Sequence, residues 1–471
     1  MFSLLAQDKN VMVTADAVGG GKLITGILHT VLMKVFTQEQ VVEGTKAIIL
    51  CPTREEATQV VTIAKRLRSE LLRKPKLFAI ELLIGGTDVS TGTDIIVATP
   101  DSLYRLDHVR SKDFPNLKIL AVVGANRIMD IYPKQSLDIL VNKSLPVAGQ
   151  TILLVEPSSR SNEDLVCQFS RDVEQATSFQ LARIPTPAGQ DAKLAKVEVL
   201  SSPYAARLGT LFAFIAKEIK QTGSEKRAII ALSSADEVRF FSQILAKLAT
   251  TDFVVKSEPG PIDAESSALT ELADSPAGLC LVTSTALTRA TVNQTVASSV
   301  HFMLQLTPAP TLPALLAHGR FTGARVIMFL DPKEEEPVLS ALPADLAISP
   351  CDWSIENAKV NNARNKVVKR VQTAMVLQKL AQQAFHGFIS EYSLPRASVM
   401  PQLKDIVRLY GLDEVVKVSL PGMDMEASGF VKVERLEVKK PVKAKKAKRA
   451  GSKAAEAKKG GKAKRGKATK E

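Results

Sequence analysis

Two successive arrays of short apolar segments constrain the fold of this chain more than any other feature. Each segment has three to five residues, is rich in Val, Ile and Leu, and is separated from the next by polar or helix-periodic sequence. Apolar strands that alternate with helices are typical of parallel sheets covered on both faces. Because the array begins again after the linker-like residues 184–193, the sequence predicts two consecutive α/β domains.

The predicted strands of the first array are Val11–Val13, Ala47–Cys51, Glu81–Ile84, Asp94–Ala98, Ile119–Val123 and Thr151–Val155. Those of the second array are Val197–Leu200, Ala228–Leu232, Phe253–Val255, Leu279–Thr283, Val300–Leu304 and Val326–Leu330. In residues 55–71 the apolar side chains fall on one helical face, which predicts a helix.

The remaining sequence changes character twice. Val367–Tyr392 is one long helical pattern and Leu403–Val418 is another, whereas the last residues are mostly Lys, Ala and Gly. Such a composition cannot form a core. The predicted divisions are a first α/β domain, a second α/β domain, a small helical domain and a disordered tail, at residues 1–185, 186–348, 349–431 and 432–471.

The net charge of +13 comes entirely from the tail. Lys439–Glu471 contain 15 Lys or Arg and 2 acidic residues, and the other 438 residues contain 47 basic and 47 acidic residues. A nucleic-acid contact in the body of the chain must therefore be local. In the tail, Lys alternates with Ala and Gly without aromatic residues, so we expect it to contact phosphates without reading sequence.

The composition is that of a soluble globular protein, with 45% hydrophobic and 24% charged residues. No apolar run approaches the roughly 20 residues that a membrane span requires, and the N-terminus lacks the features of a signal or transit peptide. Scattered cysteines without a CxxC pair argue against a zinc site and favour a reduced, intracellular compartment. These cysteines are Cys51, Cys167, Cys280 and Cys351.

Three motifs follow predicted strands in a fixed order. They are Ala47–Glu55 (AIILCPTRE), Leu83–Val89 (LIGGTDV) and Ile95–Leu103 (IIVATPDSL). In this order they resemble the DEAD-box RNA helicases, over roughly residues 2–425, and the resemblance implies two tandem RecA-like domains. Ala384–Tyr392 (AFHGFISEY) and Leu403–Met423 are similar to the C-terminal domain of the family members that act in ribosome assembly.

The segment after the fifth predicted strand departs from that family. Val123, Gly124, Ala125 and Asn126 stand where the family has Asp-Glu-Ala-Asp. Those carboxylates would hold Mg²⁺ and position the attacking water. We therefore expect no metal site and no catalytic residues in this chain.

Gly19, Gly20, Gly21 and Lys22 form the candidate phosphate loop. Such a loop needs glycines, a Lys for the phosphate oxygens and a Ser or Thr hydroxyl for Mg²⁺. If Lys22 is the phosphate lysine, Leu23 replaces the hydroxyl; in an ungapped alignment, Gly21 replaces the lysine and Lys22 the threonine. In both interpretations the loop lacks a group that phosphate or Mg²⁺ binding requires. A flexible turn between strand and helix is the favoured alternative. We therefore expect no cofactor and at most residual ATP binding.

Other family motifs are also altered. Val155–Pro157 replace the Ser-Ala-Thr that couples ATP to RNA, and Thr283–Arg289 replace a motif of the second domain. In Leu316–Arg320 only Arg320 keeps the place of a family arginine. Because phosphoryl transfer depends on positioned charges, these changes predict a loss of ATP turnover.

The residues that would grip RNA have changed less. By resemblance, the candidate positions in the body are Pro52, Thr53, Arg54, Glu55, Gly85, Gly86, Thr99, Pro100 and Arg320. The alternative is that these turns persist because the fold requires them, and Ser102 replaces a family arginine. Both interpretations remain open.

Several other side chains have ordinary structural interpretations. His318 is expected to be a surface or capping residue, and Trp353, Phe385, Phe388 and Tyr392 are expected to pack in the interior. In the tail, the strongest basic cluster fits a nuclear or nucleolar import signal, although a solubilising tail is the alternative. This cluster consists of Lys443, Lys445, Lys446, Lys448 and Arg449.

The resemblance and the tail together predict an inactive DEAD-box relative that acts as an RNA-binding scaffold in ribosome biogenesis. Its expected partners are pre-ribosomal RNA and ribosome-assembly factors, with no membrane partner, in the nucleus and nucleolus. One alternative is an active or conditionally active ATP-dependent RNA helicase. Another is a DNA- or chromatin-binding protein with a tail like that of a linker histone.

Overall fold

A computed structural model describes most of residues 4–412. The residues outside the description are 1–3, 6, 16–19, 38–43, 72–77, 85–88, 91, 105–113, 133–148, 156–161, 171–173, 175–176, 185–195, 221–224, 261–266, 290–291, 293, 310–314, 316, 322, 341, 343–345, 355, 392–401 and 413–471. The predictions for Gly19, Gly85, Gly86, Tyr392 and the tail, including Lys443–Arg449, lie outside the described residues.

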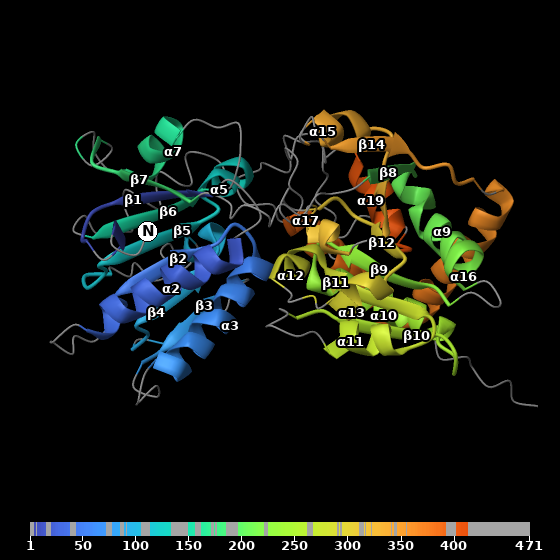
Figure 1. Cartoon of the computed structure of the whole chain (residues 1–471), viewed down its shortest axis with the longest axis horizontal. Helices are drawn as coiled ribbons and strands as arrows, with labels where there is room; N and C mark the ends of the chain where they lie inside the picture. The colour runs from blue at the N-terminus through green and yellow to red at the C-terminus, as the bar shows by residue number, and fades with distance from the viewer. Residues whose placement is uncertain are drawn as a thin grey trace, which may run out of the picture.

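The first domain is a seven-stranded parallel sheet in the order β3-β4-β2-β5-β6-β1-β7 (Figure 1). Its strands are β1 (Val11–Ala15), β2 (Ala47–Leu50), β3 (Ile80–Leu83), β4 (Ile95–Ala98), β5 (Ile119–Val123), β6 (Gln150–Val155) and β7 (Gln180–Ile184). All six predicted strands are present. The additional strand, β7, lies at the sheet edge and pairs with β1.

Helices cover both faces of this sheet. They are α2 (Gly20–Phe36), α3 (Arg54–Leu71), α5 (Ala125–Ile131) and α7 (Asn162–Phe169). Successive residues of β2 alternate between the two cores: Ile49 packs on the side of α2 and α3, whereas Ile48 and Leu50 pack on the side of α5 and α7. This burial on both faces explains why the strands are almost entirely apolar.

The second domain repeats the architecture in the order β10-β11-β9-β12-β13-β8-β14. Its strands are β8 (Lys196–Ser201), β9 (Arg227–Leu232), β10 (Val254–Glu258), β11 (Gly278–Thr283), β12 (Phe302–Gln305), β13 (Arg325–Leu330) and β14 (Ala347–Pro350). The six predicted strands are again present, and the unpredicted β14 again lies at an edge, paired with β8. The prediction of two consecutive α/β domains is confirmed.

The helical segments of the second domain surround its sheet. They are α9 (Tyr204–Phe214), η3 (Ile215–Ile219), α10 (Ala235–Leu245), η4 (Ala246–Leu248), α11 (Ser267–Asp274), α12 (Ser284–Arg289), α13 (Gln294–Ser299), η5 (Ala317–Arg320) and α15 (Glu335–Ser340). Among the described helices, none is long and apolar enough to cross a membrane.

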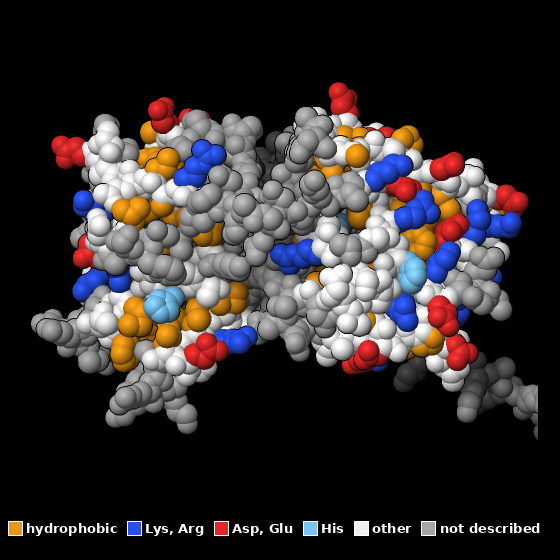
Figure 2. Space-filling model, viewed as in Figure 1, with side chains coloured by type: hydrophobic (Ala, Val, Ile, Leu, Met, Phe, Trp, Pro, Cys, Tyr) orange, Lys and Arg blue, Asp and Glu red, His pale blue; other side chains and the backbone are white. Residues whose placement is uncertain are grey.

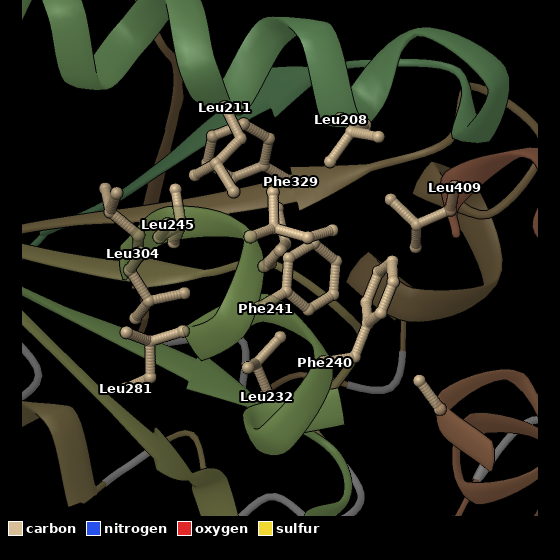
Figure 3. Close-up of a cluster of buried hydrophobic side chains, with 14 of the residues drawn as sticks. Leu208, Leu211, Leu232, Phe240, Phe241, Leu245, Leu281, Leu304, Phe329 and Leu409 are labelled. Atoms are coloured by element: carbon tan, nitrogen blue, oxygen red, sulfur yellow. The ribbon is translucent and has the colours of Figure 1, made fainter. Parts of the chain in front are cut away.

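Three further helices, α16 (Asn357–Thr373), α17 (Met375–Glu391) and α19 (Leu403–Leu409), pack on the second domain. The single helix predicted over Val367–Tyr392 is wrong, because the chain is extended at Ala374 and divides it into α16 and α17. The three helices share one hydrophobic core with the second sheet, part of which Figure 3 shows between α9, α10 and α19. Trp353, Phe385 and Phe388 belong to this packing, as expected.

Candidate functional site

The turn after β5 is apolar and buried. Val123 is the last residue of the strand, Gly124 precedes α5, and the Val123, Ala125 and Asn126 side chains are all at most 4% exposed. Gly124 has φ 61° and ψ 50°, in the left-handed region that residues with a Cβ adopt at a cost. Among the described residues no group of His, Cys, Asp and Glu is arranged to hold a metal ion.

The candidate phosphate loop lies at the beginning of α2. Gly20, Gly21 and Lys22 form the first turn of that helix, but their side-chain environment is outside the description. Leu23 is buried in the core between α2 and the sheet. If Lys22 is the phosphate lysine, the position of the Ser or Thr hydroxyl that would bind Mg²⁺ is therefore occupied by the buried core side chain of Leu23.

Arg320 belongs to the second domain and lies near α2, the helix that begins with the candidate phosphate loop. It is half-buried in η5 and donates a hydrogen bond to the Leu287 carbonyl at 3.2 Å. Burial lowers the pKa of its guanidinium. The helix that carries Leu287, α12, packs against η5 and also contacts α2 of the first domain. Arg320 is thus near the domain boundary on the side of α2.

His318 does not occupy the surface or capping position expected for it. Its side chain is fully buried, and neither ring nitrogen has a hydrogen-bond partner among the described residues. Burial lowers the pKa of the imidazole to about 4. His318 is therefore a neutral core residue at physiological pH, because charging it would bury an unpaired cation.

The candidate RNA-binding residues of the first domain differ in exposure. Pro52 and Thr53 are buried, Glu55 is half-buried, and Arg54 at the beginning of α3 is exposed. Thr99 and Pro100, which follow β4, are also buried, and the Thr99 hydroxyl bonds to Ser102 Oγ at 3.0 Å. Only Arg54 of these residues presents an open cationic side chain.

Glu55 joins the two domains. Its carboxylate accepts a hydrogen bond of 3.0 Å from the backbone N–H of Ala235, the first residue of α10. An anion is favourable there because the N–H groups of a first helical turn lack partners within the helix. Burial raises the pKa of Glu55, and nearby Asp236 raises it further, whereas the Ala235 N–H and Arg239 lower it.

Glu56 and Arg127 form a buried ion pair beside Glu55. Their side chains are only 8% and 10% exposed, and Arg127 Nη1 donates to Glu56 Oε1. The second carboxylate oxygen of Glu56 has no hydrogen-bond partner among the described residues. The Arg127 guanidinium therefore compensates for the burial of the Glu56 carboxylate.

Glu391, the last residue of α17, completes this group from the second domain. It is 2% exposed, and its Oε2 atom has no hydrogen-bond partner among the described residues. Burial, followed by repulsion from Glu55 and Glu56, raises its pKa, against the attraction of Arg127 and a hydrogen bond with the Thr53 side chain. Glu56 and Glu391 thus share one buried arginine, and the neighbouring carboxylates favour the protonated form of Glu391.

An earlier turn of α17 also lies over this boundary. Burial and the charge of Arg54 lower the pKa of His386, and Asp236 acts in the opposite sense. A Cβ built on Gly387 would lie 2.5 Å from Ser234 Oγ, immediately before α10. Helix α17 therefore packs against α10 and places His386 within electrostatic range of Arg54 at the beginning of α3. Figure 1 shows α17 at the face of the second domain turned toward the first.

The N-terminus of α10 is fixed by a second buried network. Ser234 and Glu237 form a capping box, and Glu237 also accepts hydrogen bonds from Ser233 and from the Tyr410 hydroxyl at 2.7 Å. Burial, stronger than these hydrogen bonds, raises the pKa of Glu237 to about 7. The network holds the Ala235 N–H in the position where Glu55 meets it.

We define the interdomain cluster as Thr53, Arg54, Glu55, Glu56, Arg127, Ala235, His386 and Glu391. Only Thr53, Arg54 and Glu55 were predicted as site residues. A glutamate such as Glu56 within an apolar helical face is a signal of a buried ion pair, but the sequence does not identify its partner. Glu391 gives no such signal, because it stands at the end of a helix beside a polar segment.

Residues 1–155 match the model of the DEAD/DEAH box helicase family. The first domain is a DEAD-box helicase domain. The match contains β1 to β6, the Pro52–Glu55 turn and the apolar turn at Val123–Asn126.

Two curated relatives illustrate the extent of the similarity beyond the DEAD-box domain. ATP-dependent RNA helicase DBP4 of Kluyveromyces lactis is 27% identical over 242 residues, which are 50% of this chain and 30% of that protein. ATP-dependent RNA helicase HAS1 of Lodderomyces elongisporus is 24% identical over 434 residues, which are 86% and 72% of the two chains. The chain thus spans less than a third of the DBP4 relative and most of the HAS1 relative.

The solved structure of the DEAD-box helicase Mss116 bound to ssRNA and UDP-BeF has the same fold. It matches with a TM-score of 0.53 and 17% identity, over 87% of this chain and 84% of that chain. The two parallel sheets flanked by helices are accordingly tandem RecA-like domains, as the sequence predicted.

Proposed function

We propose that this chain is an RNA-binding scaffold of ribosome biogenesis that has the fold of a DEAD-box helicase but does not hydrolyse ATP. The observation that carries the proposal is the turn at Val123–Asn126. By the sequence resemblance, the buried side chain of Val123 and the left-handed Gly124 stand where the family has its metal-binding carboxylates. A partner protein has no route to supply a metal ligand inside this buried turn.

RNA-stimulated ATP hydrolysis by the full-length chain tests the absence of turnover, with Lys22→Ala as the control. We expect the two proteins to hydrolyse ATP at the same background rate. Turnover that the Lys22→Ala change abolishes would contradict the proposal. It would instead favour the second candidate function, an ATP-dependent RNA helicase, which is what the names of the curated relatives state.

The assignment to ribosome biogenesis rests on the resemblance of the C-terminal helices to one subset of the family and on the basic tail. We propose pre-ribosomal RNA and assembly factors as partners, and the nucleolus as the location. Co-sedimentation of the chain with pre-ribosomal particles is the expected result. Sedimentation with chromatin would favour the DNA-binding alternative.

The tail and the body have separate roles in this proposal. The tail, with 15 basic and 2 acidic residues, binds phosphates, whereas the body makes the specific contacts. Deleting Lys439–Glu471 should reduce the slope of log affinity for RNA against log salt concentration, because each lost phosphate contact on single strands contributes about 0.7 to that slope. An unchanged slope would contradict this division.

A further inference from the structure

Helix α16 and the helix that follows it contain a local excess of positive charge. Residues Asn357–Ser390, which form α16 and nearly all of α17, include six Lys or Arg and no Asp or Glu. The rest of the body, residues 1–356 and 391–438, includes 41 basic and 47 acidic residues. A clustered set of cations on one element is the electrostatic signature of a nucleic-acid contact. This segment therefore has the local excess that such a contact requires in a body without net charge.

The packing of α16 decides which of its side chains face outward. Val360, Val367 and Val371 are at most 7% exposed and form its inner side. A Cβ built on Gly209 of α9 would collide with the Val360 carbonyl, so the two helices are in close contact. Arg370 also belongs to the packing, because it donates a hydrogen bond of 3.2 Å to a backbone carbonyl of α10. The remaining cations of α16 are free to act elsewhere.

Three of these cations are exposed lysines on the outer side of the helix. We define the α16 lysine stripe as Lys359, Lys366 and Lys369, which lie within about 80° of one another around the helix and span roughly 15 Å of its axis. Lys359 pairs with Glu356 at 3.4 Å, but both side chains are more than half exposed, so the pair contributes little. Lys366 and Lys369 have no ion-pair partner among the described residues.

Amide side chains make up most of the remaining exposed surface of α16. They are Asn357, Asn361, Asn362, Asn365 and Gln372. An amide both donates and accepts hydrogen bonds, which suits phosphate oxygens and the 2′-hydroxyl of RNA together. Among the exposed residues of α16, all within the described part of the chain, Ala358 alone is apolar. The helix thus lacks the apolar centre of a protein interface and the aromatic groups that stack on bases.

The described part of the chain ends beside α16. A Cβ built on Gly411 would lie 3.4 Å from Val371 Cβ, and the description stops at the next residue, Leu412. Only 26 residues separate Leu412 from Lys439, where the basic tail begins. The tail is therefore tethered next to this helix, and RNA that the tail binds is held at a raised local concentration there.

We propose that the α16 lysine stripe is an additional RNA-binding surface of the body, which binds the sugar-phosphate backbone of RNA held by the tail. This inference rests on the proposed RNA binding by the chain. Figure 1 shows α16 on the side of the second domain away from the first, so the surface is separate from the Pro52–Glu55 segment at the domain boundary. It binds by charge and hydrogen bonding, without reading base sequence.

The test compares Lys366→Ala/Lys369→Ala with Lys65→Ala/Lys247→Ala in the full-length chain. All four lysines are exposed, and both variants remove two positive charges, but only the first pair belongs to the stripe. Alanine favours a helix, so we expect both variants to fold. Affinity for a single-stranded RNA is measured by fluorescence anisotropy over a range of salt concentrations.

The stripe variant should reduce the slope of log affinity against log salt by about 1.4, which is two phosphate contacts on a single strand. The ratio of wild-type to variant affinity should accordingly fall about sevenfold between roughly 50 and 200 mM salt, whereas the control variant should bind with the wild-type slope. Equal slopes of the two variants would overturn the inference, because the stripe would then contribute no more than any exposed lysines.

Lysine acetylation followed by mass spectrometry locates the contact directly. RNA should protect Lys366 and Lys369 from acetylation and leave Lys65 reactive. Poly-glutamate, at the same concentration of negative charge, is the competing probe and should protect the stripe less than RNA does. Protection by poly-glutamate but not by RNA would overturn the inference, because the surface would then receive an acidic protein segment.

Deletion of Lys439–Glu471 distinguishes failure of this inference from failure of the proposed function. If the deletion lowers the salt slope while the stripe variant behaves like its control, the chain binds RNA through the tail and α16 takes no part. If the wild-type chain shows no salt-dependent RNA binding at all, both the inference and the proposed RNA-binding function are overturned.

Discussion

The Glu55 carboxylate of the DEAD-box domain accepts a 3.0 Å hydrogen bond from the Ala235 backbone N–H, 180 residues later in the chain. The two residues are at corresponding positions, because each lies at the beginning of the helix that follows a central strand of its sheet. Corresponding ends of the two domains thus face each other at this contact, and the carboxylate of one meets the helix N-terminus of the other.

Removal of the single buried arginine of the interdomain cluster should be strongly destabilising. We expect Arg127→Ala to lower the free energy of unfolding by about 3–5 kcal/mol, because the Glu56 and Glu391 carboxylates lose their shared cation. Urea denaturation measures the change. Arg66→Ala is the matched control, since Arg66 pairs with Glu70 on the surface and its loss should cost less than about 0.5 kcal/mol. Equal effects of the two changes would contradict a compensating role for Arg127.

Gly387 allows α17 to approach the beginning of α10. In an unhindered helix interior, Gly→Ala stabilises by roughly 0.5–1 kcal/mol. Here the added Cβ would lie 2.5 Å from Ser234 Oγ, so we expect Gly387→Ala to destabilise by about 1–3 kcal/mol in thermal or urea unfolding. Gly92→Ala is the control, because a Cβ at Gly92 has no atom within 4 Å. A stabilising Gly387→Ala change would show that the two helices are not in close contact.

Introducing acidic residues at the turn after β5 should not produce ATP hydrolysis above the wild-type level. The left-handed conformation at Gly124 makes Gly124→Glu unfavourable by about 1–2 kcal/mol. We therefore expect Val123→Asp/Gly124→Glu to lower stability without ATP hydrolysis above the wild-type level. Gly92→Glu at an exposed turn is the stability control. ATP hydrolysis by the double variant would mean that the rest of the nucleotide site is intact.

Glu237 should make the chain less stable as pH rises toward neutrality. Its pKa is about 7 in the folded state, against 4.5 for the ordinary side chain, so the folded state binds its proton more tightly. The stabilisation is complete below about pH 4.5 and is lost as pH rises through 7. Thermal unfolding between pH 5 and 8 should show this decline in the wild-type chain and a flatter profile in Glu237→Gln. Identical profiles would show that Glu237 is not the titrating group.

His318 contributes to the pH dependence of stability with the opposite sign, so its effect must be separated from that of Glu237. Its folded pKa of about 4 lies below the ordinary 6.5, so the stabilisation it provides is present above pH 6.5 and is lost as pH falls toward 4. The two windows overlap between about pH 4.5 and 6.5. The difference between the wild-type and Glu237→Gln profiles isolates the carboxylate, because His318 is common to both.

Away from α16, the distribution of charge on the surface gives no simple indication of where the body of the chain binds RNA. Figure 2 shows Lys, Arg, Asp and Glu side chains interspersed over the described residues on this face. The body of the chain has no net charge, and the contacts that matter in the interdomain cluster are buried. Composition is therefore a poor guide to the interdomain cluster, although it shows that the excess positive charge lies in the tail.

Sequence patterning determined the two sheets, because central strands that are buried on both faces require continuous apolar runs. It missed β7 and β14, whose edge positions leave them partly exposed. Leu181 in β7 is 57% exposed, and β14 is mostly exposed. It also joined α16 and α17, because the apolar period continues across Ala374 although the backbone does not remain helical there.

The sequence by itself also determined that Val123–Asn126 carry no carboxylate, since residue identity alone decides which ligands a turn can offer. Only the tertiary structure decided which charges meet. Glu55, Glu56, Arg127 and Glu391 come from three helices and two domains, and nothing in their local sequence specifies their common environment. Burial and proximity set the directions of the pKa shifts of Glu55 and Glu391 and the pairing of Glu56 with Arg127, and both are properties of the packed chain rather than of any segment of it.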